Sequence, residues 1–446
     1  MLIRFTVSNF LSFDEETVFD MLASSSAEHP DHVSAIGNVK VVKNAAIYGA
    51  NGSGKSNLVR AIDTFISIIK NGKLSENINT YKFKLNPESK DLPVKFEMEF
   101  SIGDTMYLYG IECNNKTIEH EWLYDTTDPV NDELLLERKT VGNRSYEIEF
   151  CQKWNETPEQ KVINGVLEKN LLRDDELVLD YHDTLLIGDL SLIIKYLQEN
   201  VIVIKTNSTP ESFFEFLHTH TDIASISEFI ARFDTGIQSV TIEEIPLENI
   251  LADYSNFLEK YKLLLTKEDL KHMQGLSSNF YHSVSQDAAF FKVNDKVVFR
   301  KILFEHRDIH NDKVGFFIEQ ESEGTHRIID LLPIELSKNI NDIVWIIDEI
   351  DNSLHPNLCY EFVKSLMTDR NGNSQIIFTT HQPNLLTREL FRDDEIWFVE
   401  KDKHKGNTSL YPLFEFDVKE GFNIQDGYLL GRFGGVPILD THNFML

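Results

Sequence analysis

Eight consecutive residues near the N-terminus have the types and spacing of a phosphate-binding loop. Residues 49–56 read GANGSGKS and fit the pattern G-x-x-x-x-G-K-[ST] in full. In such a loop the glycines let backbone N–H groups close round phosphate oxygens, the lysine reaches the β- and γ-phosphates, and the final hydroxyl ligates Mg²⁺. The sequence therefore predicts a site for ATP and Mg²⁺. The site comprises Gly49, Ala50, Asn51, Gly52, Ser53, Gly54, Lys55, Ser56 and Asn57, with Lys55 also catalytic and Ser56 on the metal.

An acidic pair and a histidine supply the other groups that phosphoanhydride hydrolysis needs. Asp348 and Glu349 follow an apolar run at 343–347, and His381 follows another at 375–378. We expect Asp348 to hold Mg²⁺ and Glu349 to polarise the attacking water. The imidazole of His381 can hydrogen-bond the γ-phosphate or that water. Taken alone, such an acidic pair is often a solvated turn and a lone histidine is more often structural. The phosphate-binding loop upstream favours the catalytic interpretation of both.

A third segment, ESEGT at 321–325, combines small hydroxyl residues with a flexible glycine ahead of a helix expected over 327–332. Ser322, Gly324 and Thr325 can bind a phosphate from the side, because a helix N-terminus attracts anions. Read without its context, the segment is simply a helix N-cap. The residues alone leave both interpretations open.

These groups need an α/β framework to bring them together. The run at 39–47 is apolar and β-branched, and residues 57–70 carry Leu58, Ile62, Ile66 and Ile69 at helical spacing, which predicts a strand–loop–helix unit. Continuous apolar runs such as 343–347 and 375–378 are typical of parallel strands buried on both faces. A further strand is expected at 395–400.

The intervening sequence has two other patterns. Apolar and polar residues alternate from 94 to 150, with turn pairs between the runs, which predicts an antiparallel meander. From 153 to about 310 the spacing is helical, without a continuous heptad repeat, so we expect a compact helical insert. The candidate helices are 157–170, 190–200, 210–218, 223–233 and 247–265. The expected parts are therefore the first half of an ATPase head at 1–152, a helical insertion domain at 153–310, and the second half of the head at 311–446.

Composition excludes several classes of protein. The 446 residues include 43 Lys and Arg against 72 Asp and Glu, a formal charge of −29. This balance excludes a sequence-wide basic coat for nucleic acid, although a local basic groove stays open. The sequence contains no stretch of about 18 uncharged apolar residues, so no membrane span is expected. The three cysteines lie far apart and predict neither a disulfide framework nor a zinc site, so a reducing cytoplasm is the expected location.

Other histidine and acidic groups are interpreted as structural. His218 and His220, and likewise His29 and His32, lack a supporting pattern of cysteines or carboxylates, so a polar helix end is favoured over a metal site. The acidic run 393–395 is interpreted as a turn between a helix and a strand. The predicted metal ligands are therefore Ser56 and Asp348 alone.

The order of the motifs resembles that of the ABC/SMC-type ATPases: phosphate loop, Ser-x-Gly-Thr segment, Asp-Glu pair, histidine. It is closer still to the AAA15 family, relatives of the overcoming-lysogenization-defect ATPases. Further stretches that resemble this family run along nearly the whole chain, at 3–13, 234–237, 321–327, 348–356 and 431–434. The implied fold is an α/β, ABC/SMC-type P-loop NTPase head with an antiparallel β lobe and the inserted α-helical domain.

The resemblance implies an assembly as well as a fold. In this superfamily two heads dimerise head to tail, so Ser322, Gly324 and Thr325 of one chain would act on the ATP of the other. Asn352 and Ser353 would lie in the loop that links the two sites, and His381 resembles the switch histidine. One departure is the glutamine loop of ABC-type ATPases. The family-like position, 81–85, contains no glutamine.

Stand-alone ATPases of this family resemble one half of two-gene phage-defence modules. The resemblance implies a sensor or scaffold that answers a phage-derived trigger and controls a toxic nuclease encoded by a neighbouring gene, as a dimer or higher oligomer. No nuclease centre is evident, since too few residues follow His381 for the TOPRIM domain of the larger relatives. Two alternatives are a transporter ATPase subunit and a DNA-associated repair ATPase. A repair ATPase of this class would be expected to have a long coiled coil and a basic face. DNA binding stays open but is not favoured.

Overall fold

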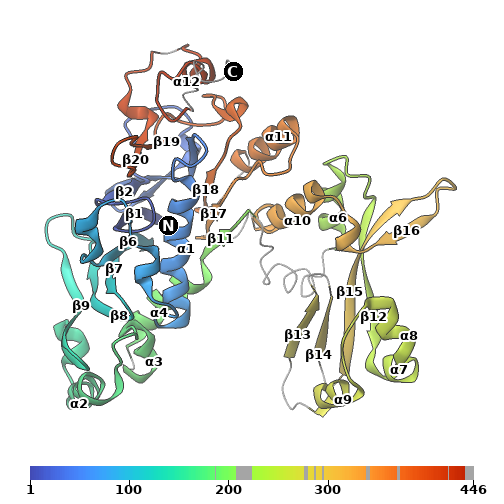
Figure 1. Ribbon diagram of the computed structural model, residues 1–446, viewed down its shortest axis with the longest axis horizontal. Helices are drawn as coiled ribbons and strands as arrows, with labels where there is room; N and C mark the ends of the chain where they lie inside the picture. Colours follow the sequence, from blue (N-terminus) through green and yellow to red (C-terminus); the bar gives the residue numbers. More distant parts are fainter. Residues whose placement is uncertain are drawn as a thin grey trace. The chain divides into compact units, whose positions relative to one another are not determined.

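The computed structural model describes residues 1–185, 187–206, 223–275, 280–285, 288–293, 296–337, 342–368, 372–419 and 421–436. The chain divides into two compact units (Figure 1). The first unit comprises 1–206, 338–351 and 359–446, and the second comprises 207–337 and 352–358. Both ends of the sequence therefore contribute to the first unit.

A six-stranded sheet forms the centre of the first unit. Its apolar strands are buried on both faces, as expected of parallel strands. The order along the sheet is β11 (Val201–Ile204), β17 (Val344–Ile347), β18 (Gln375–Thr379), β5 (Asn44–Gly49), β19 (Ile396–Lys401) and β20 (Thr408–Pro412). All neighbours are parallel except β20, which is antiparallel to β19. The predicted α/β class and the predicted parallel strands are confirmed.

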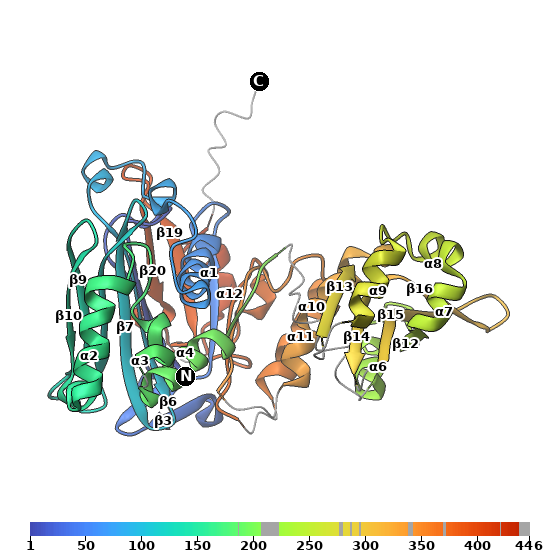
Figure 2. The same ribbon diagram turned by 90° about the horizontal axis from the view of Figure 1, so that it is seen from below.

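A seven-stranded antiparallel sheet forms the second layer of this unit (Figure 2). Its order is β10 (Ser145–Phe150), β9 (Glu133–Gly142), β8 (Thr117–Asp125), β7 (Thr105–Asn114), β6 (Val94–Ile102), β1 (Leu2–Ser8) and β2 (Thr17–Asp20). The sequential pairing of β6 to β10 is the predicted meander. Helix α1 (Lys55–Asn71) packs against this sheet, since the ring of Phe65 stacks on Phe96 and Tyr109 at 5.8 Å.

Shorter elements complete the first unit. They are β3 (Val33–Ile36), β4 (Val39–Val42), α2 (Pro158–Val166), α3 (His182–Leu185), α4 (Gly188–Glu199), α11 (Pro356–Met367, which begins in the second unit) and α12 (Ile424–Leu429). No helix within the described part of the chain is long and apolar enough to cross a membrane.

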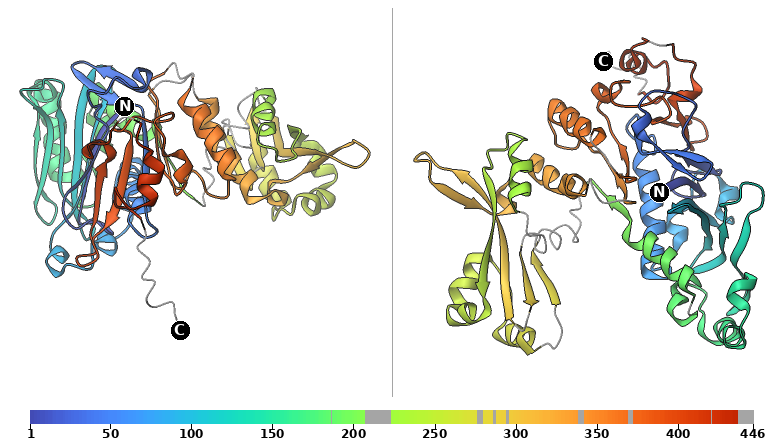
Figure 3. Two further views of the ribbon diagram at one scale, coloured as in Figure 1. Left: turned by 90° about the horizontal axis from the view of Figure 1, so that it is seen from above. Right: turned by 180° about the vertical axis from the view of Figure 1, so that it is seen from behind.

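The second unit is built on an antiparallel sheet of its own. The order is β12 (Ser239–Pro246), β15 (Lys296–Arg307), β14 (Ala288–Val293) and β13 (Phe280–Ser285), and β16 (Lys313–Phe316) also pairs with β15. Helices pack on this sheet round Phe257, Phe290 and Phe299 (Figure 3). Among the described residues of the unit, the helices are α6 (Ile223–Ala231), α7 (Leu247–Ala252), α8 (Tyr254–Tyr261), α9 (Lys267–Gly275) and α10 (Glu323–Leu336).

The prediction of a helical domain at 153–310 is wrong in two respects. Residues 153–206 belong to the first unit, where Trp154 and Leu190 are part of its core and β11 joins the central sheet. The remainder contains β12, β13, β14 and β15, four strands of the five-stranded sheet. Consecutive charged residues, Glu243 and Glu244 in β12 and Arg300 and Lys301 in β15, interrupt the apolar alternation, which hides the strands in the sequence. Helices near 190–200 and 223–233 are present, 247–265 divides at Asp253, and 210–218 lies outside the described residues.

Candidate active site

The phosphate-binding loop joins β5 to α1 through a backbone that only glycine adopts easily. Gly52 and Gly54 have φ angles of +76° and +117°, where a side chain is strained. A Cβ on Gly54 would also lie 2.3 Å from Oγ1 of Thr408. That hydroxyl donates to the carbonyl of Ser53 at 2.8 Å and shares a hydrogen bond with Ser12 Oγ, which holds the loop from behind.

Lys55 lies at the base of the loop with its ammonium group turned onto the backbone. Its Nζ donates to the carbonyls of Gly49 at 2.6 Å and Ala50 at 3.2 Å. Burial lowers the pKa of Lys55 to about 8, while the negative charges of Glu349 and Asp348 oppose that shift. The loop therefore holds a cation whose charge state changes within an accessible pH range.

Asp348 is the point where three hydroxyl groups converge. Its Oδ1 accepts hydrogen bonds from Ser56 at 3.1 Å and from Thr379 at 2.8 Å, and its Oδ2 accepts one from Thr206 at 3.2 Å. Ser56 opens α1, whereas Thr206 and Thr379 lie at or just beyond the ends of β11 and β18. A hydroxyl and a carboxylate in contact offer the oxygen ligands that Mg²⁺ takes from proteins of this kind. The two predicted metal ligands thus lie together.

Glu349 is held in an unusual backbone conformation at the edge of the cleft. Its φ angle is +48°, which is uncommon for a residue other than glycine. The N–H of Glu349 donates to Thr379 Oγ1 at 2.7 Å, so the same threonine positions both acidic residues. Backbone strain of about 1–3 kcal/mol persists where the surrounding structure enforces it, as at catalytic sites.

His381 lies beside Glu349 across the mouth of the cleft. Its Nε2 is 3.8 Å from Glu349 Oε1, and its backbone N–H donates to the carboxylate of Asp351 at 3.2 and 3.3 Å. Burial and the nearby Lys55 lower the pKa of His381, against the opposing effect of Asp351 and the other carboxylates. The imidazole is therefore neutral near pH 7 and can both donate and accept a hydrogen bond.

These groups line a cleft with a volume of about 540 Å³. Its walls are residues 51–57 together with Glu349 and His381. No side chain caps the first turn of α1, and the buried Oγ of Ser53 has no hydrogen-bond partner among the described residues. Helix-start amides and an unsatisfied hydroxyl suit phosphate oxygens. The residues present therefore fit a nucleotide and its Mg²⁺ ion.

The predicted signature segment lies in the second unit. Ser322 is the N-cap of α10, and its Oγ accepts the N–H of Thr325 at 3.2 Å. Ser322 is exposed and Thr325 is buried. A Cβ on Gly324 would lie 3.0 Å from the carbonyl of Ser353, so the start of α10 packs on the turn that contains Asn352 and Ser353. The structure thus brings the signature segment and the expected linking loop together.

Sequence reasoning missed several residues that shape the cleft. Thr379, Thr206 and Asp351 position the acidic pair and the histidine, and Thr408 supports the loop. A hydroxyl residue directly after a predicted strand was the only available signal for Thr379. Residues 81–85, the family-like position of the glutamine loop, are not among the described residues that line this cleft. His218 and His220 lie outside the described residues.

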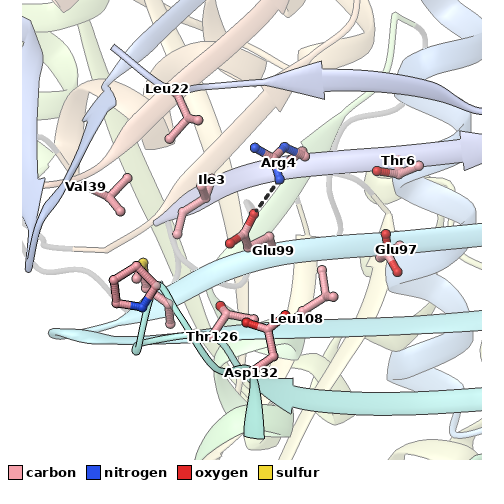
Figure 4. A pocket seen from close by; sticks show the side chains of 12 residues that line it. Ile3, Arg4, Thr6, Leu22, Val39, Glu97, Glu99, Leu108, Thr126 and Asp132 are labelled. Carbon is pink, nitrogen blue, oxygen red and sulfur yellow. Dashed lines mark hydrogen bonds and ion pairs between the residues drawn. The ribbon is translucent and has the colours of Figure 1, made fainter. Parts of the chain in front are cut away.

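A second hollow, of about 360 Å³, lies over β1, β6 and β7 and has a different character (Figure 4). Arg4 lies beside Glu99 and contacts it at 3.1 Å. Glu97 and Asp132 also line the space. Three carboxylates against one guanidinium repel phosphate groups, so this hollow is not a second nucleotide site.

The fold and the cleft define a P-loop ATPase of the α/β class. Residues 45–142 and 201–387 match the family AAA_21, described as "AAA domain, putative AbiEii toxin, Type IV TA system". This match spans more than half of the chain, and the chain belongs to that family. ATPase families of this type use ATP with a divalent metal ion. No curated protein sequence matches the chain.

Among solved structures, the chain is similar to SMC head domains. One, bound to the C-terminal winged-helix domain of ScpA, is 14% identical, with a TM-score of 0.45 over 92% of this chain and 97% of that one. The SMC head of Thermotoga maritima is 11% identical, with a TM-score of 0.38 over 92% and 98%. An SMC head with an extended coiled coil, bound to the C-terminal domain of ScpA from Pyrococcus furiosus, is 13% identical, with a TM-score of 0.40 over 97% and 98%.

Proposed function

We propose that the chain hydrolyses ATP to ADP and phosphate in the cleft between the phosphate-binding loop and the acidic pair. The observation that carries this proposal is the convergence of Ser56, Asp348 and Glu349 at one edge of the parallel sheet. Loop amides and Lys55 hold the phosphates. Mg²⁺, when bound by Ser56 and Asp348, neutralises phosphate charge.

The chemical step needs one proton acceptor beside the attacking water. Glu349 takes the proton of the water as its oxygen bonds to the γ-phosphorus, and the bond from that phosphorus to the β–γ bridging oxygen breaks. The neutral imidazole of His381, 3.8 Å from Glu349, orients the water or the γ-phosphate by a hydrogen bond. ADP leaves with the electron pair of the broken bond.

We infer further that two chains complete each other's sites in an ABC/SMC-type, head-to-tail dimer. The start of α10 supports this proposal, because its N-cap residue, Ser322, is exposed, and a helix N-terminus attracts anions. Ser322, Gly324 and Thr325 of one chain would contact the γ-phosphate held by the other. Gly324 packs closely on the carbonyl of Ser353, which would lie 3.0 Å from a Cβ at this position, so this segment contacts the turn after the acidic pair.

At the level of the cell, we propose a sensor or scaffold that controls a toxic nuclease from a neighbouring gene during phage infection. The support for this role is the resemblance of the motif order. The family description names a putative toxin of a type IV toxin–antitoxin system, which connects the family with such systems but not with a nuclease partner. ATP would hold the heads together, and a phage-derived trigger would change that state and release or activate the nuclease. The acidic composition favours a protein partner over DNA.

Light scattering of a hydrolysis-deficient variant tests the enzymatic proposal. Glu349→Gln removes the proton acceptor and keeps the size of the side chain, so ATP should still bind while turnover falls by about 100-fold or more. The variant should accumulate as an ATP-bound dimer. Glu389→Gln, remote from the cleft, is the matched control. Wild-type turnover in Glu349→Gln would refute the assignment of Glu349.

Co-purification with the product of the neighbouring gene, in the presence of ATP, tests the cellular proposal. A stable complex with a nuclease of defined stoichiometry is the expected result. A lone dimer that binds DNA in a salt-dependent manner only when ATP is present would instead identify a DNA-associated repair ATPase.

A further inference from the structure

Two histidines and an aspartate form a cluster in the first unit, at the opposite edge of the central sheet from the nucleotide cleft. His29, Asp31 and His32 each offer one side-chain ligand atom, and these atoms lie within 4.8 Å of one another. His32 is buried, His29 is half-buried and Asp31 is exposed. The cluster lies next to the start of β5, whereas the phosphate-binding loop follows its end. A six-residue strand, about 20 Å long, separates the two sites.

The environment of His32 determines which ring nitrogen is available. Its Nδ1 lies 2.9 Å from a carboxylate oxygen of Glu395. Glu395 is fully buried and also accepts hydrogen bonds from Asn44 Nδ2 and from the backbone N–H of Arg392, both at 2.9 Å. A carboxylate held by these donors acts as an acceptor, so Nδ1 of His32 carries the proton. The lone pair therefore resides on Nε2.

The same reasoning applies to His29. Its Nε2 lies 2.7 Å from the backbone carbonyl of Arg388. A carbonyl oxygen only accepts, so Nε2 of His29 donates and Nδ1 carries the lone pair. Metal-ligating histidines typically donate their other N–H to a carboxylate or to a backbone carbonyl. His32 has the carboxylate of Glu395 as this partner, and His29 has the backbone carbonyl of Arg388.

A buried arginine fixes the segment that carries the cluster. Arg392 forms an ion pair with Asp394 at 2.8 Å. Its Nη1 also donates to the carbonyls of Ser26 and Glu28, directly before His29. The two histidines are thus attached to the turn at 388–395 by side-chain and by backbone contacts. These contacts hold the backbone that carries the two imidazoles, with a carboxylate between them in the sequence.

We propose that His29 Nδ1, His32 Nε2 and the carboxylate of Asp31 bind one divalent transition-metal ion, with water at the remaining positions. Two neutral imidazoles and one carboxylate suit Zn²⁺ and its neighbours better than Mg²⁺. Ligand bonds of about 2.1 Å need ligand atoms roughly 3.0–3.5 Å apart, so the ring of His29, now stacked on His32 at 4.7 Å, turns on binding. The ion would tie residues 29–32 to the strands that flank the phosphate-binding loop.

Equilibrium dialysis against Zn²⁺ tests the site without relying on ATP hydrolysis. The full chain, stripped by a chelator, is dialysed against Zn²⁺ in slight excess over the chain, with a large excess of Mg²⁺ that competes for the nucleotide cleft. The double variant His29→Gln with Asp31→Asn alters only ligands that are not fully buried, so it is expected to fold. The matched control is His310→Gln with Asp312→Asn, an exposed pair in the second unit.

Wild-type and control chains should retain one Zn²⁺ more than the double variant, and the variant should bind Zn²⁺ at least about tenfold more weakly. Zn²⁺ should raise the Tm of the wild type and leave that of the variant unchanged. Co²⁺ bound to the wild type should show visible absorption that the variant lacks. Equal Zn²⁺ content and equal Co²⁺ spectra in both chains would overturn the proposal.

Discussion

At the scale of single residues, Lys55 is the group on which nucleotide affinity depends most. Lys55→Ala removes the main cation of the phosphate site and should weaken ATP binding by about 10- to 100-fold, the effect of one charge-assisted hydrogen bond. Isothermal titration calorimetry measures the change. Lys70→Ala, at the far end of the same helix, should bind ATP like the wild type. Equal affinities for both variants would contradict the role of Lys55.

The lowered pKa of Lys55 predicts a pH dependence of nucleotide binding. With a pKa of about 8, the ammonium is charged at pH 7 and largely neutral at pH 9. ATP should therefore bind more weakly at pH 9, and binding near pH 8.5 should take up protons, because phosphate favours the charged lysine. Calorimetry in buffers of different ionisation enthalpy detects this uptake. Its absence in wild-type protein would show that Lys55 stays charged.

The free energy of unfolding depends on pH in the opposite direction from ATP affinity: the contribution of Lys55 to it rises as the pH rises. A lysine whose pKa is lowered on folding penalises the folded state below that pKa. The penalty disappears as the pH rises from about 8 towards the ordinary value of 10.5.

Thr379 is the residue whose importance is least visible in the sequence. Its hydroxyl contacts Asp348 and accepts the N–H of Glu349. Thr379→Val keeps the shape and removes both contacts, so kcat should fall by about tenfold or more while ATP affinity changes less. Steady-state kinetics and ATP titration separate the two effects. Thr380→Val is the control, and a higher KM with unchanged kcat would assign Thr379 to binding alone.

At the scale of elements, three neighbouring parallel strands explain why the site forms. In register, Ile347 lies opposite Phe378, and Phe378 lies opposite Ala46, so β17, β18 and β5 end at one edge of the sheet. Side chains just beyond these ends converge although they are about 300 residues apart. Ligands of open α/β sheets bind at such carboxyl edges.

The start of α10 is the element that tests the shared site. Gly324→Asp adds a negative charge where the proposed dimer presents a helix N-terminus to phosphate, so ATP should bind each chain normally while turnover is abolished. Nucleotide binding and phosphate release measured on one sample test this. Gly165→Asp adds the same charge at an open position and serves as the control. Full turnover in Gly324→Asp would exclude a role for this segment.

At the scale of the whole molecule, mixing two inactive variants separates a shared site from an independent one. In a head-to-tail dimer of Lys55→Ala with Gly324→Asp, one site carries both defects and the other carries neither. An equal mixture should therefore regain up to about a quarter of wild-type turnover, if chains exchange at random. Subunit exchange, measured by light scattering or fluorescence on the same mixture, is the control. Exchange without regained activity would contradict complementation between chains.

Features that depend on local chemistry can be recognised from the sequence alone. The phosphate-binding loop is recognisable because Gly52, Gly54 and Lys55 act within eight residues, and the parallel strands are recognisable because burial on both faces requires continuous apolar runs. The meander follows from alternation in the same way. Such patterns reflect the conformational preferences of neighbouring residues.

Only the tertiary structure decided which distant side chains meet. Thr379 and Thr206 reach Asp348, and Thr408 closes behind Gly54, through strand order and register that no local pattern contains. The sheet of the second unit was hidden because consecutive charged residues, as at 243–244 and 300–301, break the apolar alternation of its strands. His29 and His32 look like ordinary surface histidines until folding places Arg388 and Glu395, more than 350 residues away, at their other ring nitrogens.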